Sequence, residues 1–219
     1  MEQFLPILKK TKLFSGVDAD EISSMFSCLG ASLRFYKKGE FVLRQGERVG
    51  GIMVLAEGNL HIQSDDYWGN RSILGEICAG EMFGEAYAAA ESCALPNDVV
   101  AVTDSAVLRF DVNRILTTCS SGCRFHKTVV QNLFFAISEK NRKLVQKLGI
   151  MSKRTTREKL ISYLSEQSKK QNSASFSIPF NRRQLADFLS VDRSALSNEL
   201  CRMRDEGMIK FEKNRFILL

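Results

Sequence analysis

Histidine is scarce in this chain, with two among 219 residues. Two imidazoles leave little general-base capacity, and the sequence shows neither a nucleophile–base–acid trio nor a phosphate-binding loop, so we do not expect an enzyme. It also lacks any uninterrupted run of 18 apolar residues and any basic segment leading into an apolar one near Met1. We therefore expect no membrane span and no signal peptide, and a cytoplasmic protein.

Cysteine is too thinly and irregularly spread for a disulfide-stapled domain. The six thiols stand at positions 28, 78, 93, 119, 123 and 201. We expect reduced, mostly buried thiols, no bound metal and no resident cofactor. Cys119, Cys123 and His126 form a Cys-x3-Cys-x2-His run, so a redox- or metal-responsive pair at the two cysteines is the alternative.

Net charge is missing from the first two thirds of the chain. Residues 150–219 hold 14 Lys/Arg against 8 Asp/Glu, whereas residues 1–149 hold 17 against 17, by count from the sequence. The whole formal excess of +6 therefore lies in the last 70 residues. A surface for an acidic partner is expected there.

Glycine is concentrated near the start, with 11 of the 14 in the first 84 residues. Short runs of Val, Ile, Leu and Phe alternate with these glycines, a pattern typical of strands and tight turns in an antiparallel barrel or sandwich. Capping chemistry at Asp18 predicts a short helix before the strands. Strands are predicted over residues 31–36, 41–44, 52–55, 60–62, 72–77, 98–102 and 106–110.

Residues 125–151 are predicted to form one long amphipathic helix. Its apolar positions recur at three- and four-residue steps, although Asn141 falls near the stripe and breaks a strict heptad. An apolar stripe of this length needs a cover, which indicates a dimerisation helix; packing within its own chain is the alternative. The stripe consists of Val130, Leu133, Ile137, Leu144, Leu148 and Met151.

The last 70 residues show the pattern of a helix-turn-helix with a terminal hairpin. A helix is predicted over residues 156–167, a polar loop over 168–173, and two helices over 182–189 and 192–206. Small Ala186 permits the two helices to approach closely, and the apolar positions around it supply a small core. The two hairpin strands are predicted over residues 208–211 and 215–219.

The second of these helices carries polar side chains on one face, as a recognition helix does in the major groove. Asp192 caps it, Asn198 can pair with adenine, and Arg193 can contact guanine or a phosphate. Lys210, Lys213 and Arg215 of the hairpin are available to phosphates; solvated helix positions are the alternative interpretation. The candidate DNA-binding residues are Arg182, Arg183, Arg193, Ser194, Ser197, Asn198 and Lys213.

Glycine-bearing motifs complete a resemblance that covers essentially the whole chain. Gly39-Glu40, Gln45-Gly46-Glu47, Gly58 and the run from Gly80 to Glu85, followed by the Leu185 to Leu200 segment, resemble the CRP/FNR family of bacterial transcription factors. The resemblance implies an α+β chain. Its parts are an N-terminal antiparallel β-roll, a cyclic-nucleotide-binding-like jelly roll, over residues 1–120, a long dimerisation helix over 121–150 and a winged helix-turn-helix over 151–219.

The same resemblance implies a homodimer that reads a two-fold symmetric operator in double-stranded DNA under the control of a small-molecule effector, with RNA polymerase as a further partner. Where the family frequently has a Glu and an Arg in the recognition helix, this chain has Ser194 and Asn198. We therefore expect an operator that differs from the usual half-sites of the family. A ligand-binding module without DNA contact is the alternative function.

The effector site implied by the resemblance lies between the β-roll and the long helix. Cyclic-nucleotide members follow the acid that matches Glu85 with an Arg-Ser or Arg-Thr pair that clamps the phosphate, whereas residues 87–96 here contain no basic residue. A buried phosphate without such a partner is costly, so we expect an uncharged effector rather than cAMP. The expected site residues are Phe83, Gly84, Glu85, Ala86 and Tyr87.

Iron–sulfur and haem chemistry are also not expected. Iron–sulfur members of the family share an N-terminal cluster of three closely spaced cysteines, whereas the first two cysteines here are Cys28 and Cys78. His61 and His126 are the only histidines, and a lone histidine in a strand is more often structural. The identity of the effector is left open.

Overall fold

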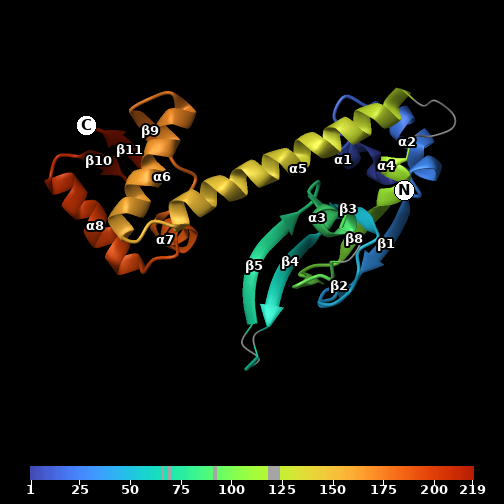
Figure 1. Ribbon diagram of the computed structural model, residues 1–219, viewed down its shortest axis with the longest axis horizontal. Coiled ribbons are helices and arrows are strands. Elements are labelled where there is room, and N and C mark those ends of the chain that lie inside the picture. Colours follow the sequence, from blue (N-terminus) through green and yellow to red (C-terminus); the bar gives the residue numbers. More distant parts are fainter. Residues whose placement is uncertain (66, 69–70, 91–92, 118–123) are drawn as a thin grey trace. The chain divides into compact units, whose positions relative to one another are not determined.

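The computed structural model describes residues 1–65, 67–68, 71–90, 93–117 and 124–219 (Figure 1). Residue contacts divide the chain into two units, Met1–Glu139 and Lys140–Leu219. The long helix α5 (Arg124–Met151) runs from the first unit into the second. In the described part of the chain, every helix is too short or too polar to span a lipid bilayer.

Two antiparallel sheets form the β-roll of the first unit (Figure 1). One has the order β1 (Ser32–Tyr36), β8 (Ser105–Asp111), β3 (Gly51–Glu57) and β6 (Met82–Phe83). The other has the order β2 (Phe41–Leu43), β7 (Asp98–Ala101), β4 (Asn59–Asp65) and β5 (Arg71–Cys78). The predicted β-roll is confirmed, with β6 as a short addition that the pattern of residues did not indicate.

Strand β3 is buried on both faces, and its side chains alternate between two cores. Ile52 and Val54 belong to the cluster that the first sheet shares with the helices, whereas Met53 and Leu55 belong to the cluster between the sheets. A strand covered on both sides must be apolar throughout, which explains the run Ile-Met-Val-Leu-Ala.

Helices cover the outer face of the β1–β8–β3–β6 sheet. The predicted helix after Asp18 is α2 (Ala19–Cys28), and its capping box joins Asp18 to Glu21. Phe14 and Phe110 meet edge to face, with ring centroids 5.3 Å apart, and link the N-terminal segment to β8. The additional short helices are η1 (Glu2–Phe4), α1 (Leu5–Leu8), α3 (Glu85–Ala88) and α4 (Val112–Leu116).

Gly58 makes the turn between β3 and β4 with a φ of +94°. A Cβ atom at this position would lie 2.6 Å from the carbonyl oxygen of Asp104, closer than real Cβ atoms come. Both the backbone conformation and the neighbouring loop therefore require glycine here.

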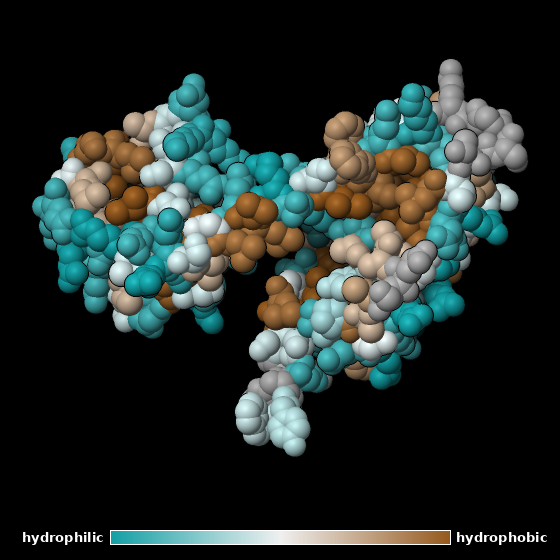
Figure 2. Space-filling view, in the orientation of Figure 1, coloured by the Kyte–Doolittle hydropathy of each residue, from teal (hydrophilic) through white to brown (hydrophobic). Residues whose placement is uncertain are grey.

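Helix α5 packs into the first unit along one part of its length and leaves another stripe exposed. Val129, Leu133 and Ala136 enter the core under the sheet, so the predicted stripe is partly covered by its own chain. Phe134, Ile137, Leu144, Val145 and Leu148 remain exposed. Figure 2 shows hydrophobic side chains at the surface along α5.

The second unit contains α6 (Thr156–Gln171), α7 (Arg182–Leu189) and α8 (Arg193–Asp205) around one core. The predicted loop is wrong for residues 168–171, which extend α6 because Lys169 and Lys170 suit the negative end of a helix dipole. The predicted hairpin, β10 (Ile209–Glu212) and β11 (Arg215–Leu218), gains a third strand, β9 (Ser175–Ser177).

Candidate functional site

Helices α7 and α8 form the predicted helix-turn-helix through a tight, locally capped turn. Asn181 and Gln184 make a capping box at the start of α7. Ser190 ends α7 in the left-handed conformation with a φ of 49°, and the Val191 amide donates to the Ala186 carbonyl at 3.0 Å. The apolar side chains between the helices, Leu185, Ala186, Leu189, Leu196 and Leu200, are all buried. This small core sets the angle between the two helices.

Asp192 begins α8 by accepting hydrogen bonds from the backbone amides of Ser194 at 2.8 Å and Ala195 at 2.9 Å. The Ser194 hydroxyl also donates to this carboxylate. These hydrogen bonds, led by the one from the hydroxyl, lower the pKa of Asp192. The cap therefore stays ionised at neutral pH and holds the first turn of α8 in place.

Some polar side chains on the exposed face of α8 already make hydrogen bonds within the protein, and others do not. The Ser194 hydroxyl donates to Asp192, and the Ser197 hydroxyl donates to the Arg193 carbonyl at 2.9 Å, so both act first within the helix. The side chains of Arg193 and Asn198 are exposed and make no hydrogen bond to any residue that the structure describes. On this face of α8, the side chains of Arg193 and Asn198 are therefore free to contact a partner molecule.

Arg182 takes a different position from the other predicted DNA contacts. Its guanidinium carbon lies 4.7 Å from the ring centroid of Phe211 and 5.1 Å from that of Phe216, so it stacks on the wing formed by β10 and β11. Burial lowers the pKa of Arg182. Arg183, the next residue, is exposed. Arg182 therefore fixes the wing to the first turn of α7.

A groove of about 510 Å³ separates the start of α7 from the wing turn. Lys213, at the tip of the turn, has a φ of 50°, and Asn214 beside it donates to the Ile178 carbonyl at 3.0 Å. Cationic side chains and the positive end of a helix at one groove suit an anion. The lining residues are Pro179, Phe180, Asn181, Arg182, Gln184, Lys213 and Asn214.

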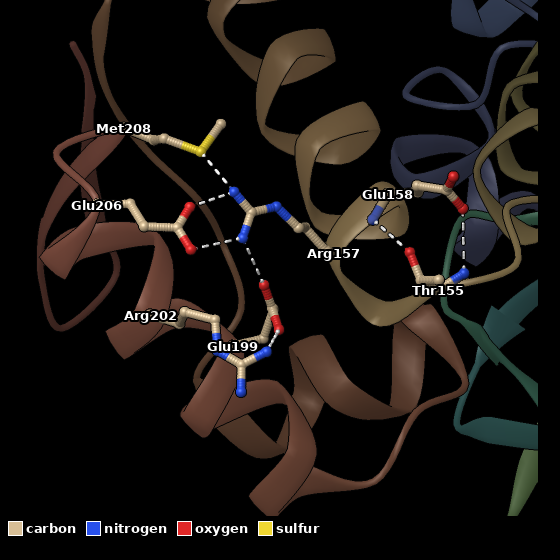
Figure 3. Close-up of polar contacts among 7 residues, drawn as sticks. All are labelled: Thr155, Arg157, Glu158, Glu199, Arg202, Glu206 and Met208. Carbon is tan, nitrogen blue, oxygen red and sulfur yellow. Dashed lines mark hydrogen bonds and ion pairs between the residues drawn. The ribbon is translucent and has the colours of Figure 1, made fainter.

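A charged network on another side of α8 holds the recognition helix to α6 (Figure 3). Arg157 of α6 donates to both carboxylate oxygens of Glu206 and reaches Glu199 of α8 at 3.3 Å. It also contacts the Met208 sulfur at 3.0 Å, and Arg202 lies 3.5 Å from Glu199. Sequence reasoning missed this network because its members are up to 51 residues apart.

The predicted effector segment lies where β6 meets α3. Gly84 adopts a left-handed conformation with a φ of 79° and precedes the buried side chain of Glu85. A Cβ atom on Gly84 would lie 3.4 Å from a methyl group of Val49. Phe83 is buried in the core between the sheets and Tyr87 packs against that core, whereas Ala86 is exposed. The structure thus brings Glu85 and Tyr87 beside the inner wall of the β-roll.

Arg48 is a basic residue near the stretch that lacks one in sequence. It forms an isolated antiparallel bridge with Ala94, and the Leu95 amide donates to the Glu47 carbonyl at 2.9 Å. Its side chain, with those of Arg34 and Arg109, lines a pocket of about 270 Å³ at the β1 and β2 side of the roll. Glu81, close to the predicted site in sequence, instead accepts a hydrogen bond from the Cys78 amide at 2.9 Å.

His126 is buried and engaged on both ring nitrogens. Nε2 lies 2.6 Å from the Ile115 carbonyl oxygen, and Nδ1 lies 3.9 Å from the Cys28 sulfur. Cys119 and Cys123, the proposed redox or metal pair, lie outside the described residues. Among the residues that are described, no three His, Cys, Asp or Glu side chains are grouped to hold a metal ion.

Two family models match the chain, one in each part. Residues 33–121 match the cyclic nucleotide-binding domain, and residues 158–219 match the Crp-like helix-turn-helix domain. Human cGMP-dependent protein kinase 2 is 25% identical over 111 residues, which are 50% of this chain and 14% of the kinase. The mouse kinase is 24% identical over the same shares. The chain therefore corresponds to a small part of these relatives.

Solved structures share the fold over nearly the whole chain. The catabolite activator protein of Thermus thermophilus is 20% identical, covering 95% of this chain and 94% of its own, with a TM-score of 0.56. CprK in complex with OCPA is 15% identical, with 91% of each chain covered and a TM-score of 0.61. The c-di-GMP responsive regulator CLP of Xanthomonas campestris is 16% identical, covering 92% and 99%, with a TM-score of 0.54.

A cyclic nucleotide-binding-type β-roll followed by a long helix and a Crp-like helix-turn-helix defines a class of DNA-binding transcription regulators. With these two matched domains, the chain is a CRP-like transcription regulator.

Proposed function

We propose that the protein is a homodimeric, sequence-specific regulator that reads a two-fold symmetric operator in double-stranded DNA. The observation that carries the proposal is the exposed face of α8, where the side chains of Arg193 and Asn198 make no hydrogen bond to any described residue. A recognition helix needs such unsatisfied donors and acceptors to read base edges in the major groove.

The contacts to DNA divide into reading and anchoring groups. Asn198 and Arg193 read base edges, whereas Arg183 and Lys213 contact phosphates. The hydroxyls of Ser194 and Ser197 already donate hydrogen bonds within α8 and its cap, so they contribute less to base reading. Arg182 lines the groove at the wing but is stacked on Phe211 and Phe216, so it positions the wing for the phosphate backbone.

The dimer forms through α5, within an organisation of β-roll 1–120, dimerisation helix 121–150 and winged helix 151–219. Phe134, Ile137, Leu144 and Leu148 are exposed at spacings of three, seven and four residues, with Asn141 in the gap of seven. This is the seam of a two-helix coil in which a polar residue at one core position sets the register.

The effector binds at the β-roll around Gly84, Glu85 and Tyr87, next to Phe83 and Ala86, and is an uncharged small molecule rather than cAMP. The relatives include a kinase named for cGMP dependence, but the Arg-Ser or Arg-Thr pair that clamps the phosphate is missing from residues 87–96 here. Arg48 lines a pocket with Arg34 and Arg109, and the lining of that pocket includes none of the residues from Phe83 to Tyr87.

Fluorescence anisotropy with labelled duplex DNA tests the proposal. Selection of bound duplexes from a random pool should return a palindromic site with half-sites one helical turn apart. Affinity for that site should fall steeply with salt, because each phosphate contact releases a counterion. Absence of duplex binding at low salt, with the chain folded and dimeric by sedimentation, would leave a ligand-binding module as the function.

A further inference from the structure

A large groove in the second unit belongs to neither the DNA-reading face nor the predicted effector segment. It measures about 670 Å³ and lies between the end of α5, α6, and the start of the helix-turn-helix. The rings of Tyr163, Phe180 and Phe188 form one wall, with centroids 5.0 to 6.2 Å apart. Leu144 and Ile150 of α5 also line it. The groove therefore offers aromatic and aliphatic surface of the size of a ring-containing small molecule.

A buried hydrogen-bond donor in this wall has nothing to bind. The side chain of Tyr163 is 2% exposed, and its hydroxyl has no hydrogen-bond partner among the described residues. Burial, with a smaller contribution from Glu166, raises the pKa of Tyr163 to about 12. The phenol is therefore protonated at neutral pH and acts as a donor. An orphaned buried donor is destabilising, and an acceptor oxygen on a ligand would satisfy it.

The rim of the groove is cationic. Lys140, Lys143, Lys147 and Lys170 line it together with a single acid, Glu166. Lys147 Nζ lies 5.5 Å from the ring centroid of Phe188, so positive charge sits directly beside the aromatic wall. An anion is favoured over a neutral or cationic ligand at such a rim.

We propose that this groove binds an aromatic carboxylate. The ring of the ligand lies against Phe180 and Phe188, its carboxylate accepts a hydrogen bond from Tyr163, and Lys147 supplies the countercharge. The site goes beyond the proposed effector site, because none of its lining residues belongs to the β-roll. Since α5 and α7 both line it, the ligand ties the end of the dimerisation helix to the first helix of the DNA-binding motif.

Titration of the full-length protein with 2-naphthoate in a calorimeter tests the site. Tyr163→Phe keeps the ring and removes the donor, and we expect about a tenfold loss of affinity, the value of one hydrogen bond to a charged group. Lys147→Gln should weaken binding several-fold, and neutral 2-naphthalenemethanol should bind more weakly than the carboxylate. Tyr36→Phe, which removes a hydroxyl from the β-roll, is the matched control and should leave the affinity unchanged.

Thermal unfolding separates a ligand site from a packing defect. Without ligand, Tyr163→Phe should unfold at a higher temperature than the wild type, because the orphaned hydroxyl is gone. With 2-naphthoate the wild type should gain more stability than the variant. Failure of 2-naphthoate to bind at millimolar concentration, or equal affinity in Tyr163→Phe, overturns the proposal. The proposal is also overturned if 2-naphthoate binds only to a monomeric variant, because a second copy of the chain would then cover the groove in the dimer. None of these readouts depends on DNA binding.

Discussion

In the proposed function, base reading depends on the side chains of Asn198 and Arg193. Their neighbours Ser194 and Ser197 already donate their hydroxyl protons within α8 and its cap, so they discriminate less between bases. At the scale of single residues, we therefore expect fewer residues of α8 to discriminate between bases than the number of its polar positions indicates.

Asn198→Ala should relax base preference at one position of each half-site. A bidentate amide contact to adenine is worth about 1–3 kcal/mol of discrimination, and the alanine cannot make it. Anisotropy with the selected site and with each single-base variant measures the change. Asn97→Ala, a substitution in the first unit, should leave the whole preference profile as it was; unaltered discrimination in Asn198→Ala would remove this residue from the reading face.

Because of Asp192, part of the free energy of unfolding should depend on pH. Its pKa is lowered in the fold, so its carboxylate stabilises the native state above the ordinary pKa of 3.8, and this contribution is lost as the pH falls through the lowered value. Asp192→Asn retains a capping oxygen but does not titrate. The difference in urea midpoint between pH 7 and pH 3 should therefore shrink in this variant. Asp187→Asn, on the exposed side of α7, is the control.

Local chemistry explains which residues could be found from the sequence. Asn181, Gln184 and Asp192 reveal the helix starts because capping acts within three residues. The stacking of Arg182 on Phe211 and the pairing of Arg157 with Glu206 are contacts across 29 and 49 residues, by residue number. No local pattern marks such contacts, so the sequence predicted Arg182 as a DNA contact, which stays a prediction, but could not predict that it also stacks on the wing.

The two ends of helix α8 have different roles. Arg157 and Glu206 hold its C-terminal end near α6, while its N-terminal turn presents Arg193. Exposed ion pairs alone contribute little, but this one is a two-oxygen contact within a network (Figure 3). The rigidity of the element comes from the network together with the buried leucines beneath it.

Arg157→Gln should weaken DNA binding, although we do not expect residue 157 itself to contact DNA. The loss of the fork to Glu206 and Glu199 frees α8 to move, so affinity should fall for the preferred and for unrelated duplexes alike. Titration of both duplexes, with circular dichroism to verify folding, measures this. Arg154→Gln, an exposed position before α6, is the control. A selective loss at one base position would instead place Arg157 at the DNA.

The exposed stripe of α5 gives a test of assembly. Leu148 is 66% exposed in the single chain, and a charge there would be buried in a two-helix seam. Leu148→Glu should shift the sedimentation equilibrium strongly toward the monomer. Leu74→Glu alters a similarly exposed leucine, 57%, on β5 and should stay dimeric. A dimer in both variants would move the interface away from this stripe.

At the scale of the whole molecule, the proposed two-fold dimer would double every phosphate contact. Lys213→Gln therefore removes two contacts, and the slope of log affinity against log salt should become shallower by about 2. Anisotropy at several salt concentrations measures the slope. Lys38→Gln lowers the net charge by the same amount in the β-roll and should leave the slope nearly unchanged. A change of about 1 in the Lys213 variant would indicate that one wing alone reaches the DNA.

Among the residues that the structure describes, none belongs to the hydrophobic cores of both units. Those of the first unit draw on residues 4–136, and that of the second on residues 150–218. Effects of substitutions on the stability of separate cores add rather than couple. The proposed ligand binding and DNA reading can therefore change independently in evolution: substitutions that suit the β-roll to another ligand need not destabilise the winged helix, and substitutions at Arg193 or Asn198 need not destabilise the β-roll.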